Sequence, residues 1–199
     1  MANIKLTKNE QKKQKDSLKM YTRYLPTLIL KKQQLQVEIR NVELREAEVR
    51  HKQEALNQEF RQWIAVFAED VGLDDALLRV KYVDTAKGNI AGVEIPVFKG
   101  AEFHPVSYNL FEMPLWVDKA AEKLKQIILL DLEFNVLEEQ IKRLGKELRI
   151  TTQRVNLFEK VMIPDTRANI KKIGVYLGDQ QTAAVVRGKM SKNKLVKVS

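Results

Sequence analysis

IILLDLEFNVLEEQIKRLGKELRITTQRVNLFEKVM, residues 127–162, is the stretch that decides the fold of this chain. Two rows of mostly apolar residues run through it, each repeating every seven positions. The rows are Ile127, Phe134, Ile141, Leu148, Val155 and Met162, and Leu130, Leu137, Leu144, Thr151 and Phe158. Such a sustained heptad pattern is typical of a coiled coil. It predicts a long C-terminal helix over residues 114–186, kinked near Pro164 because proline has no amide hydrogen to donate.

A second, less regular seam occupies the first half of the chain. Its rows are Leu28, Leu35, Val42, Val49, Leu56 and Trp63, and Leu25, Ile39, Phe60 and Phe67, with Lys32, Glu46 and Gln53 as polar members. This pattern predicts an N-terminal helix over residues 8–69, kinked or restarted at Pro26. At about 1.5 Å per residue, the first helix would measure roughly 90 Å and the second roughly 70 Å from Leu115 to Ile163 alone, too long for a globular core of this chain. We therefore predict a mainly α fold, in which they form a long antiparallel two-helix coiled coil.

The register of that pair follows from the heptads only in part. Antiparallel pairing fixes the sum of paired residue numbers, and a sum of 183 sets Lys32 against Thr151, the polar member of the second seam. The same sum sets Trp63 against Ala120 and Phe67 near Trp116. Sums of 176 and 190 also satisfy the heptads, so the choice stays open. In every register the two chain ends lie at the same end of the pair.

An insert over residues 70–113 separates the helices. Within it, LLRVKYVDTAKGNIAGVEIPVF predicts a β-hairpin over about 78–98 that turns near Gly88-Asn89, with Pro96 on an edge strand. We expect a single elongated domain over residues 1–199, with this small α/β insert resting on the helix ends near Trp63, Phe67, Leu115 and Trp116. The hairpin is either a structural cap or a docking surface for another protein. The candidate docking residues are Gly88, Asn89, Ile90, Gly92 and Pro96.

The net charge of +9 sits at the two ends of the chain. Residues 1–20 hold six Lys and two acidic residues, and residues 187–199, predicted as a basic tail, hold five basic residues and no acidic one. Residues 21–186 are neutral. Balanced charge along a helix is usually a solvated face, whereas two basic ends form either separate tails or a joint basic tip.

The sequence carries no recognised catalytic or membrane-spanning signature. The chain has no cysteine, no phosphate-binding glycine motif and no HExxH motif, and His51 and His104 have no evident ligand partner. We therefore expect no catalytic residues, no cofactor and no metal site. The longest apolar runs fall short of the roughly 20 residues that a membrane span needs, and no secretory signal is evident. We expect a chain in a reducing cytosol, without direct membrane insertion.

Three stretches resemble one known family. TTQRVNLFEKVMIP (151–164) is similar to a run near the end of the D subunit of V-type and archaeal-type rotary ATPases, which reads T-x-x-R-V-N-A-L-E-x-V-x-I-P. NIAGVEIPVF (89–98) resembles the hairpin motif of that family. LTKNE (6–10) and LILKKQQL (28–35) resemble its N-terminal signature. The likeness covers both helices and the insert.

This resemblance implies a non-catalytic central-stalk subunit, cytoplasmic and peripheral to the membrane. Its expected partners are the A and B subunits of the catalytic hexamer, the F subunit and the rotor base subunit of C/d type, with no nucleic acid. The candidate rotor–stator contacts are Arg154, Asn156, Glu159, Arg187, Lys189 and Lys192. Two alternatives remain: a free basic coiled-coil protein that binds nucleic acid, and a cytosolic coiled-coil scaffold.

Overall fold

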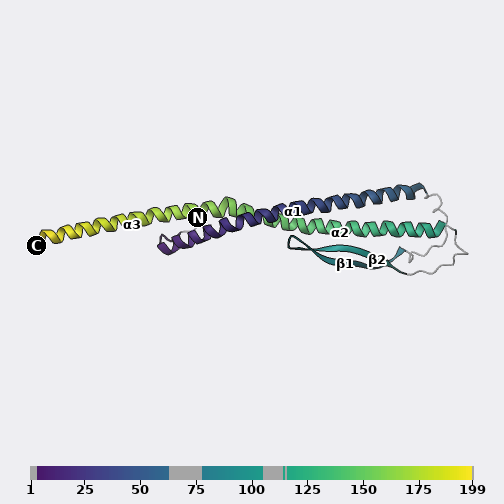
Figure 1. Cartoon of the computed structure of the whole chain (residues 1–199), viewed down its shortest axis with the longest axis horizontal. Helices are drawn as coiled ribbons and strands as arrows, with labels where there is room; N and C mark the ends of the chain where they lie inside the picture. Colours follow the sequence, from purple (N-terminus) through teal and green to yellow (C-terminus); the bar gives the residue numbers. More distant parts are fainter. Residues whose placement is uncertain (1–3, 63–77, 105–113, 115, 199) are drawn as a thin grey trace. The chain divides into compact units, whose positions relative to one another are not determined.

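The computed structural model describes residues 4–62, 78–104, 114 and 116–198 (Figure 1). The elements are α1 (Lys8–Gln62), β1 (Val80–Ile90), β2 (Val93–Phe103), α2 (Trp116–Leu157), the π-helical turn η2 (Phe158–Met162) and α3 (Ile163–Val198). They belong to two compact units. Unit 1 comprises residues 1–32 and 150–199, and unit 2 comprises residues 33–149.

The mainly α fold class is confirmed: two long helical segments pack together, and a two-stranded antiparallel hairpin lies between them in sequence. Helix α1 begins at Lys8 because Thr7 caps it, with the Glu10 amide donating to Thr7 Oγ1 at 3.3 Å. The predicted end of this helix, at residue 69, lies outside the described residues. At the other end of the chain α3 runs on to Val198, so residues 187–198 are helical.

Pro26 and Pro164 have different effects on their helices. Helix α1 passes through Pro26 without any interruption in its helical assignment. Before Pro164 the chain forms η2, in which the Ile163 amide donates to the Phe158 carbonyl, five residues back. The residues that flank η2 keep right-handed helical geometry, with φ and ψ of −62° and −46° at Leu157. The helix therefore continues through a wider turn.

In unit 2, α1 and α2 pair through their apolar seams. Leu35, Val42 and Val49 of α1 form one core cluster with Leu137 and Leu144 of α2. Three cross-helix contacts fix the register: Gln53 with Asp131, Glu59 with Lys123, and Arg50 over the Phe134 ring at 5.1 Å. The paired numbers sum to 184, 182 and 184. In unit 2 they agree with the predicted sum of 183 and exclude 176 and 190.

The remaining pairs of that register are less well defined. Trp63 and Phe67 lie outside the described residues. Lys32 and Thr151 both belong to unit 1, where the Thr151 side chain is 1% exposed. Their mutual pairing stays a prediction.

The hairpin turn lies at Ala91-Gly92, and the prediction of a turn near Gly88-Asn89 is wrong. Strands β1 and β2 pair in antiparallel fashion up to Ile90 and Val93, which leaves a two-residue loop. Ala91 has φ 51° and Gly92 has φ 80°, as a type I′ turn requires. Asn89 Oδ1 accepts a hydrogen bond from the Gly92 amide at 3.0 Å. Both Gly88-Asn89 and Ala91-Gly92 contain a glycine and could form such a turn. The strand pairing that turns at Ala91-Gly92 is the one observed, and it places Ile95 in the core.

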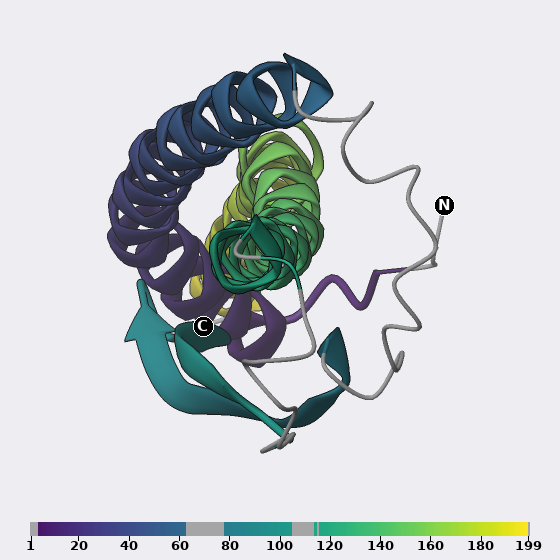
Figure 2. The same cartoon turned by 90° about the vertical axis from the view of Figure 1, so that its right-hand side faces the viewer.

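The described hairpin packs against the helices of unit 2, runs lengthwise beside them (Figure 1) and lies to one side of α2 in the end-on view (Figure 2). Ile95 is buried in the same core cluster as Leu144, Gln140 Nε2 donates to the Pro96 carbonyl at 2.6 Å, and Lys125 lies over the Phe103 ring. From Phe103 to Pro96 the strand covers about 23 Å, and from Lys125 to Gln140 the helix covers about 22 Å. Strand β2 therefore follows the α2 axis over this stretch. The predicted contact of the insert with Trp63, Phe67 and Leu115 involves residues outside the described ranges and stays a prediction.

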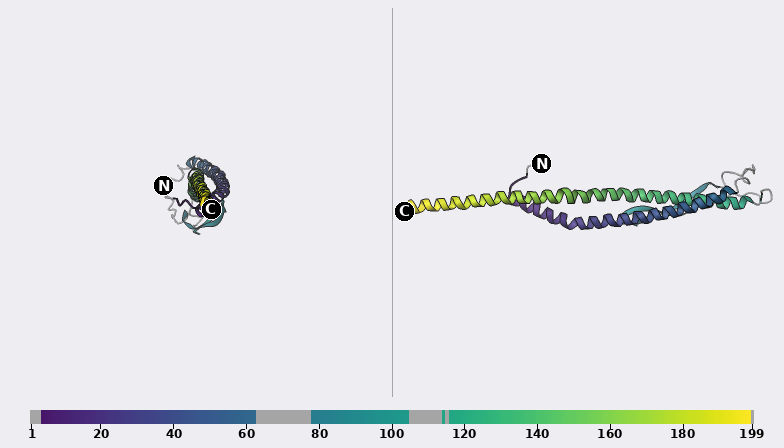
Figure 3. Two further views of the ribbon diagram at one scale, coloured as in Figure 1. Left: turned by 90° about the vertical axis from the view of Figure 1, so that its left-hand side faces the viewer. Right: turned by 90° about the horizontal axis from the view of Figure 1, so that it is seen from above.

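Unit 1 contains no described strand. Its apolar core residues are Val155, Ile163 and Ile173, and the rings of Tyr21 and Phe158 lie 5.2 Å apart. A Cβ on Gly174 would lie 3.4 Å from Gln11 Nε2, so α1 begins beside this part of α3. Helix α3 then continues past the start of α1 to Val198 (Figure 3). The two basic segments are therefore staggered along unit 1 and do not form a joint tip.

Among the described helices, none combines the length and the apolar character needed to cross a bilayer.

Candidate functional site

The last part of α3 carries the basic candidates. Arg187, Lys189 and Lys192 are all exposed there, together with the large apolar residues Val185 and Met190. Because α1 begins near the level of Gly174, this stretch has no helix of unit 1 beside it in the described part of the chain. An isolated helix of this length is only marginally stable in water. The stretch is thus suited to contact another molecule through cations and apolar side chains together.

Arg154, Asn156 and Glu159 form a second, separate exposed group. Arg154 and Asn156 belong to the last turn of α2, and Glu159 belongs to η2. All three are exposed, whereas the neighbouring Val155 is buried in unit 1. They lie off the apolar seam, as expected. About 50 Å of helix separates them from Arg187, so the two groups cannot meet one partner residue together.

The five candidate docking residues of the hairpin all have a part in its own structure. Ile90 packs against the core cluster, and the Pro96 carbonyl accepts from Gln140. Gly88 is required by close approach, since a Cβ there would lie 2.7 Å from Val97 Cγ2. Asn89 and Gly92 form the turn. These residues therefore hold the hairpin in place, and their role in docking stays a prediction.

Another set of hairpin side chains faces solvent. Tyr82 is 59% exposed and Val97 39%, and Lys87 and Lys99 are exposed as well. Sequence reasoning missed this set because two irregularities in strand pairing, at Lys81 and Lys99, break the simple alternation of faces.

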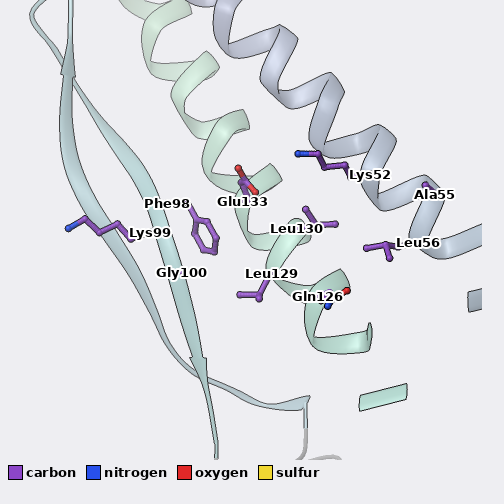
Figure 4. A pocket seen from close by; sticks show the side chains of 10 residues that line it. All are labelled: Lys52, Ala55, Leu56, Phe98, Lys99, Gly100, Gln126, Leu129, Leu130 and Glu133. Carbon is purple, nitrogen blue, oxygen red and sulfur yellow. The ribbon is translucent and has the colours of Figure 1, made fainter. Parts of the chain in front are cut away.

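A groove lies between α1, α2 and β2 in unit 2, with a volume of about 590 Å³ (Figure 4). Phe98 points toward α2, whereas Lys99 points away from it. The lining is mainly apolar and consists of Lys52, Ala55, Leu56, Phe98, Lys99, Gly100, Gln126, Leu129, Leu130 and Glu133.

One carboxyl group of unit 2 has a shifted pKa. Arg143 Nε donates to Glu139 Oε1 at 2.7 Å, one helical turn away along α2. This hydrogen bond, aided by the charges of Arg143 and Lys142, lowers the pKa of Glu139 below its ordinary value of 4.5. Both partners are largely exposed, so the pair is a surface ion pair and not a catalytic group.

The two histidines lie apart from these features. His51 is exposed on α1, and the His104 amide donates to the Arg79 carbonyl at 3.1 Å beside the end of β2. Within the described ranges no three His, Cys, Asp or Glu side chains gather as they would around a metal ion.

Sequence reasoning also missed a continuation of the seam beyond Pro164. Ile163, Thr166 and Ile173 are buried in unit 1, and Ile170 and Leu177 are half-buried. These residues follow the same spacings of three and four as the seam before η2, but one position later. The shift becomes visible in the sequence only if the seven-residue count is restarted one position later for the residues around and after Pro164.

Comparison with known proteins gives a consistent answer. The family model for the ATP synthase D subunit matches residues 10–193. A V-type ATP synthase D subunit of Borreliella burgdorferi is 52% identical over 197 residues, which cover 99% of this chain and 97% of the relative. Proteins of the same name from Chlamydia pneumoniae and Chlamydia muridarum are 34% and 36% identical, each over 96% of this chain. With helix pairs in both units and a hairpin between the halves, this chain belongs to the family of V-type ATP synthase D subunits.

Proposed function

We propose that this chain is the central-stalk subunit, the rotor shaft, of a V-type ATP synthase. It transmits torque between ATP hydrolysis or synthesis in the A/B hexamer and ion translocation by the membrane ring. One observation carries the proposal: the family match extends over residues 10–193 of a chain whose two units are both built on antiparallel helix pairs.

Packing in unit 2 supports a torque-carrying role. Leu35 and Leu144 are both 0% exposed, and the hairpin adds Ile95 to their cluster. Protein interiors are close-packed, so turning one element against another would require many side chains to leave their positions together. A pair of helices held in this way resists twisting better than a single helix does.

The chain itself is proposed to be non-catalytic. Its described surface offers contacts and no assembled acid–base or metal chemistry, so nucleotide binding and hydrolysis belong to partner subunits. The proposed partners are the A and B subunits, the F subunit and the rotor base subunit of C/d type. The proposed location is cytoplasmic and peripheral to the membrane.

The end of α3 is the proposed rotor–stator contact. Arg187, Lys189 and Lys192 are exposed cations that form ion pairs worth about 0 to 1 kcal/mol each. Weak, exchangeable pairs hold a turning helix near an axis without locking it at one angle. Arg154, Asn156 and Glu159 are proposed as a second contact group, at a different level of the shaft.

A single introduced cysteine tests the rotor assignment. The chain has no cysteine, so Lys189→Cys provides a unique thiol at an exposed position. In the assembled complex, cross-linking this thiol through a disulfide to a cysteine in one of the A or B subunits should stop ATP-driven ion transport. Reduction of the disulfide should restore it.

The matched control carries the same Lys189→Cys change blocked with a small thiol reagent, which should leave transport intact. A cross-linked complex that transports ions at the rate of the blocked control would show that this chain does not rotate against the hexamer.

A further inference from the structure

We infer that η2 is a register joint: it stores one extra residue, which lets the apolar seam change phase between Val155 and Ile163 and continue beyond Pro164. The inference concerns unit 1 alone and holds whether or not the chain acts as a rotor. It rests on the burial pattern on both sides of η2, on the hydrogen bond within it and on the unbroken phase of the partner helix.

The phase change follows from the positions of buried residues. Before η2 the seam passes through Thr151, Val155 and Phe158 at spacings of four and three. A continuous α-helix would next bring Met162, Asp165, Asn169, Lys172 and Tyr176 to the seam. Instead, Ile163, Thr166 and Ile173 are buried, with Ile170 half-buried between them. On the uninterrupted seam, Met162 and Asn169 are half-buried and Asp165, Lys172 and Tyr176 are exposed, so none of its five positions is fully buried. Every one of these positions is one residue later than the heptads require.

A π-helical turn provides this offset. The Ile163 amide bonds to the Phe158 carbonyl, five residues back, so the turn holds one residue more than an α-helical turn. The insertion therefore turns all later side chains by one position without ending the helix.

The partner helix shows no such change. The less exposed residues of α1 in unit 1 include Gln11, Gln14, Leu18, Tyr21, Leu25 and Leu28, at regular spacings of three and four. This phase continues directly into the predicted rows of the N-terminal seam. The extra residue therefore belongs to one helix of the pair, so the joint does not arise from a matching break in both.

The sequence confines the joint to a narrow interval. Moving it toward the N-terminus would bring Thr152, Asn156 and Glu159 to the seam in place of Thr151, Val155 and Phe158. Moving it toward the C-terminus would bring Asp165, Asn169 and Lys172 inward in place of Thr166, Ile170 and Ile173. Burial of unpaired polar or charged groups is costly, so both movements are opposed. The joint is thus confined to the interval between Val155 and Ile163.

Pro164 is compatible with the joint but does not explain the phase change. Proline lacks the amide hydrogen, and its ring clashes with the carbonyl four residues back in an α-helix. The wider turn before Pro164 relieves that clash. Proline alone, however, gives no reason for Ile163, Thr166 and Ile173 to stand one position late in the sequence.

Deletion of Val161, an exposed residue of η2, tests the inference in the full chain. Without it, the residues from Ile163 onward fall into the heptads of an uninterrupted α-helix. An uninterrupted α-helix would restore the clash at Pro164, so this deletion and its control are both made in a Pro164→Ala chain. We expect the melting midpoint, followed by far-ultraviolet circular dichroism, to stay equal to or rise above that of Pro164→Ala alone. Amide hydrogen exchange of residues 156–163 should slow, because regular α-helical hydrogen bonds replace the turn.

Deletion of Lys171, an exposed residue of α3, is the matched control. If η2 persists, the residues from Ile173 onward fall out of phase with the seam. If regular α-helix replaces η2, Ile163 to Ile170 are out of phase instead. Its melting midpoint should fall by about 5 °C or more. If deletion of Val161 lowers the midpoint as much as deletion of Lys171, η2 does not store a spare residue and the inference is overturned.

A third variant, Pro164→Ala, separates the joint from the effect of proline. A crystal structure of this variant should retain the bond from the Ile163 amide to the Phe158 carbonyl, because the seam still requires the extra residue. Loss of that bond while Ile173 stays buried would assign η2 to proline alone and overturn the inference.

Discussion

Units 1 and 2 are both built on antiparallel helices, yet they bury polar groups in different ways. In unit 2 the buried Gln140 side chain joins two elements, since it donates to the Pro96 carbonyl of β2. In unit 1 the buried Thr166 hydroxyl bonds to the Met162 carbonyl of its own helical run, at 2.5 Å. A polar bond between elements fixes their register, whereas a bond within one helix only supports its local shape.

The apolar cores of the two units also differ in the elements that form them. Unit 2 packs residues from α1, α2 and β2 into one cluster, in which Leu35 and Leu144 are fully buried. In unit 1 the described core comes from helices alone, and its seam includes Thr151 and Thr166 beside Val155 and Ile173. The hairpin adds a third layer to the core of unit 2, which the described core of unit 1 lacks. We therefore expect unit 2 to be the more stable unit, and each prediction below bears on that comparison.

The largest effect is expected from Leu144→Ala in unit 2. Removal of a fully buried leucine side chain leaves a cavity against α1 and the hairpin, with an expected cost of about 2 to 5 kcal/mol. Urea denaturation of the full chain should measure this loss. Leu44→Ala is the matched control, because Leu44 is 65% exposed on α1 and should change stability little.

The same truncation at Ile173 sharpens the contrast. Ile173 is also 0% exposed, but it lies in unit 1 beyond the joint. We expect Ile173→Ala to speed amide exchange in α3 while leaving protection of the hairpin amides unchanged. Equal loss of hairpin protection in Ile173→Ala and Leu144→Ala would show that the two units unfold as one.

The next effect concerns the polar link of unit 2. Gln140→Leu removes the donor to the Pro96 carbonyl and leaves that carbonyl without this partner, at an expected cost of about 1 to 3 kcal/mol. Amide exchange of β2 should accelerate, because the strand loses its polar attachment to α2. Gln153→Leu, at an exposed position of α2, is the control. Unchanged exchange in β2 would mean that Ile95 alone holds the hairpin.

A smaller effect is expected from Thr166→Val in unit 1. The change keeps the shape of the side chain but removes the hydroxyl that donates to the Met162 carbonyl. We expect a loss of about 1 kcal/mol, with faster exchange confined to residues near η2. Thr182→Val, which removes an exposed hydroxyl bonded to the Gly178 carbonyl, should cost less. A cost at Thr166 equal to that of Gln140→Leu would contradict the ranking of the two polar links.

The smallest effect is electrostatic. Arg143→Gln should raise the pKa of Glu139 toward 4.5, because the hydrogen bond and charge that lower it are lost. In the wild type the folded-state pKa is depressed, so this contribution to stability is present above 4.5 and is lost as the pH falls through the folded-state pKa. Carboxyl titration by nuclear magnetic resonance measures the shift. An unchanged Glu139 pKa in Arg143→Gln would show that another group sets it.

Heptad spacing made most of unit 2 predictable. Val42, Val49, Leu137 and Leu144 were all placed on seams from the sequence, and all are buried. The polar pair Lys32 and Thr151 pointed to a sum of 183, which the contacts of Gln53 and Glu59 support in unit 2. The heptad pattern predicts burial correctly here because, at each turn of the helix, the apolar side faces the interface and the polar side faces water.

The candidate site was less predictable from the sequence. Exposure of Arg154, Asn156 and Glu159 agrees with their predicted place off the seam, and Arg187 is exposed in the segment predicted as a basic tail. The contacts of all four residues stay predictions. The docking candidates belong to the predicted hairpin and its family-like motif, yet Ile90 and Pro96 attach the hairpin to its own unit. Turn-forming residues show where a chain reverses, but which strand face meets the helices depends on bulges and on packing against partners distant in sequence.

Heptad periodicity alone predicts two long helices, their antiparallel pairing and the positions of the seam as far as Met162, because it shows which side of each helix avoids water. Only the tertiary structure decided that the turn lies at Ala91-Gly92, that β2 follows α2 and that the seam resumes one residue late at Ile163. Each of these features is a choice among locally similar alternatives. Packing decides between them, because one register buries Ile95 and one phase buries Ile173, whereas the alternatives leave these side chains in water or bring polar groups inward.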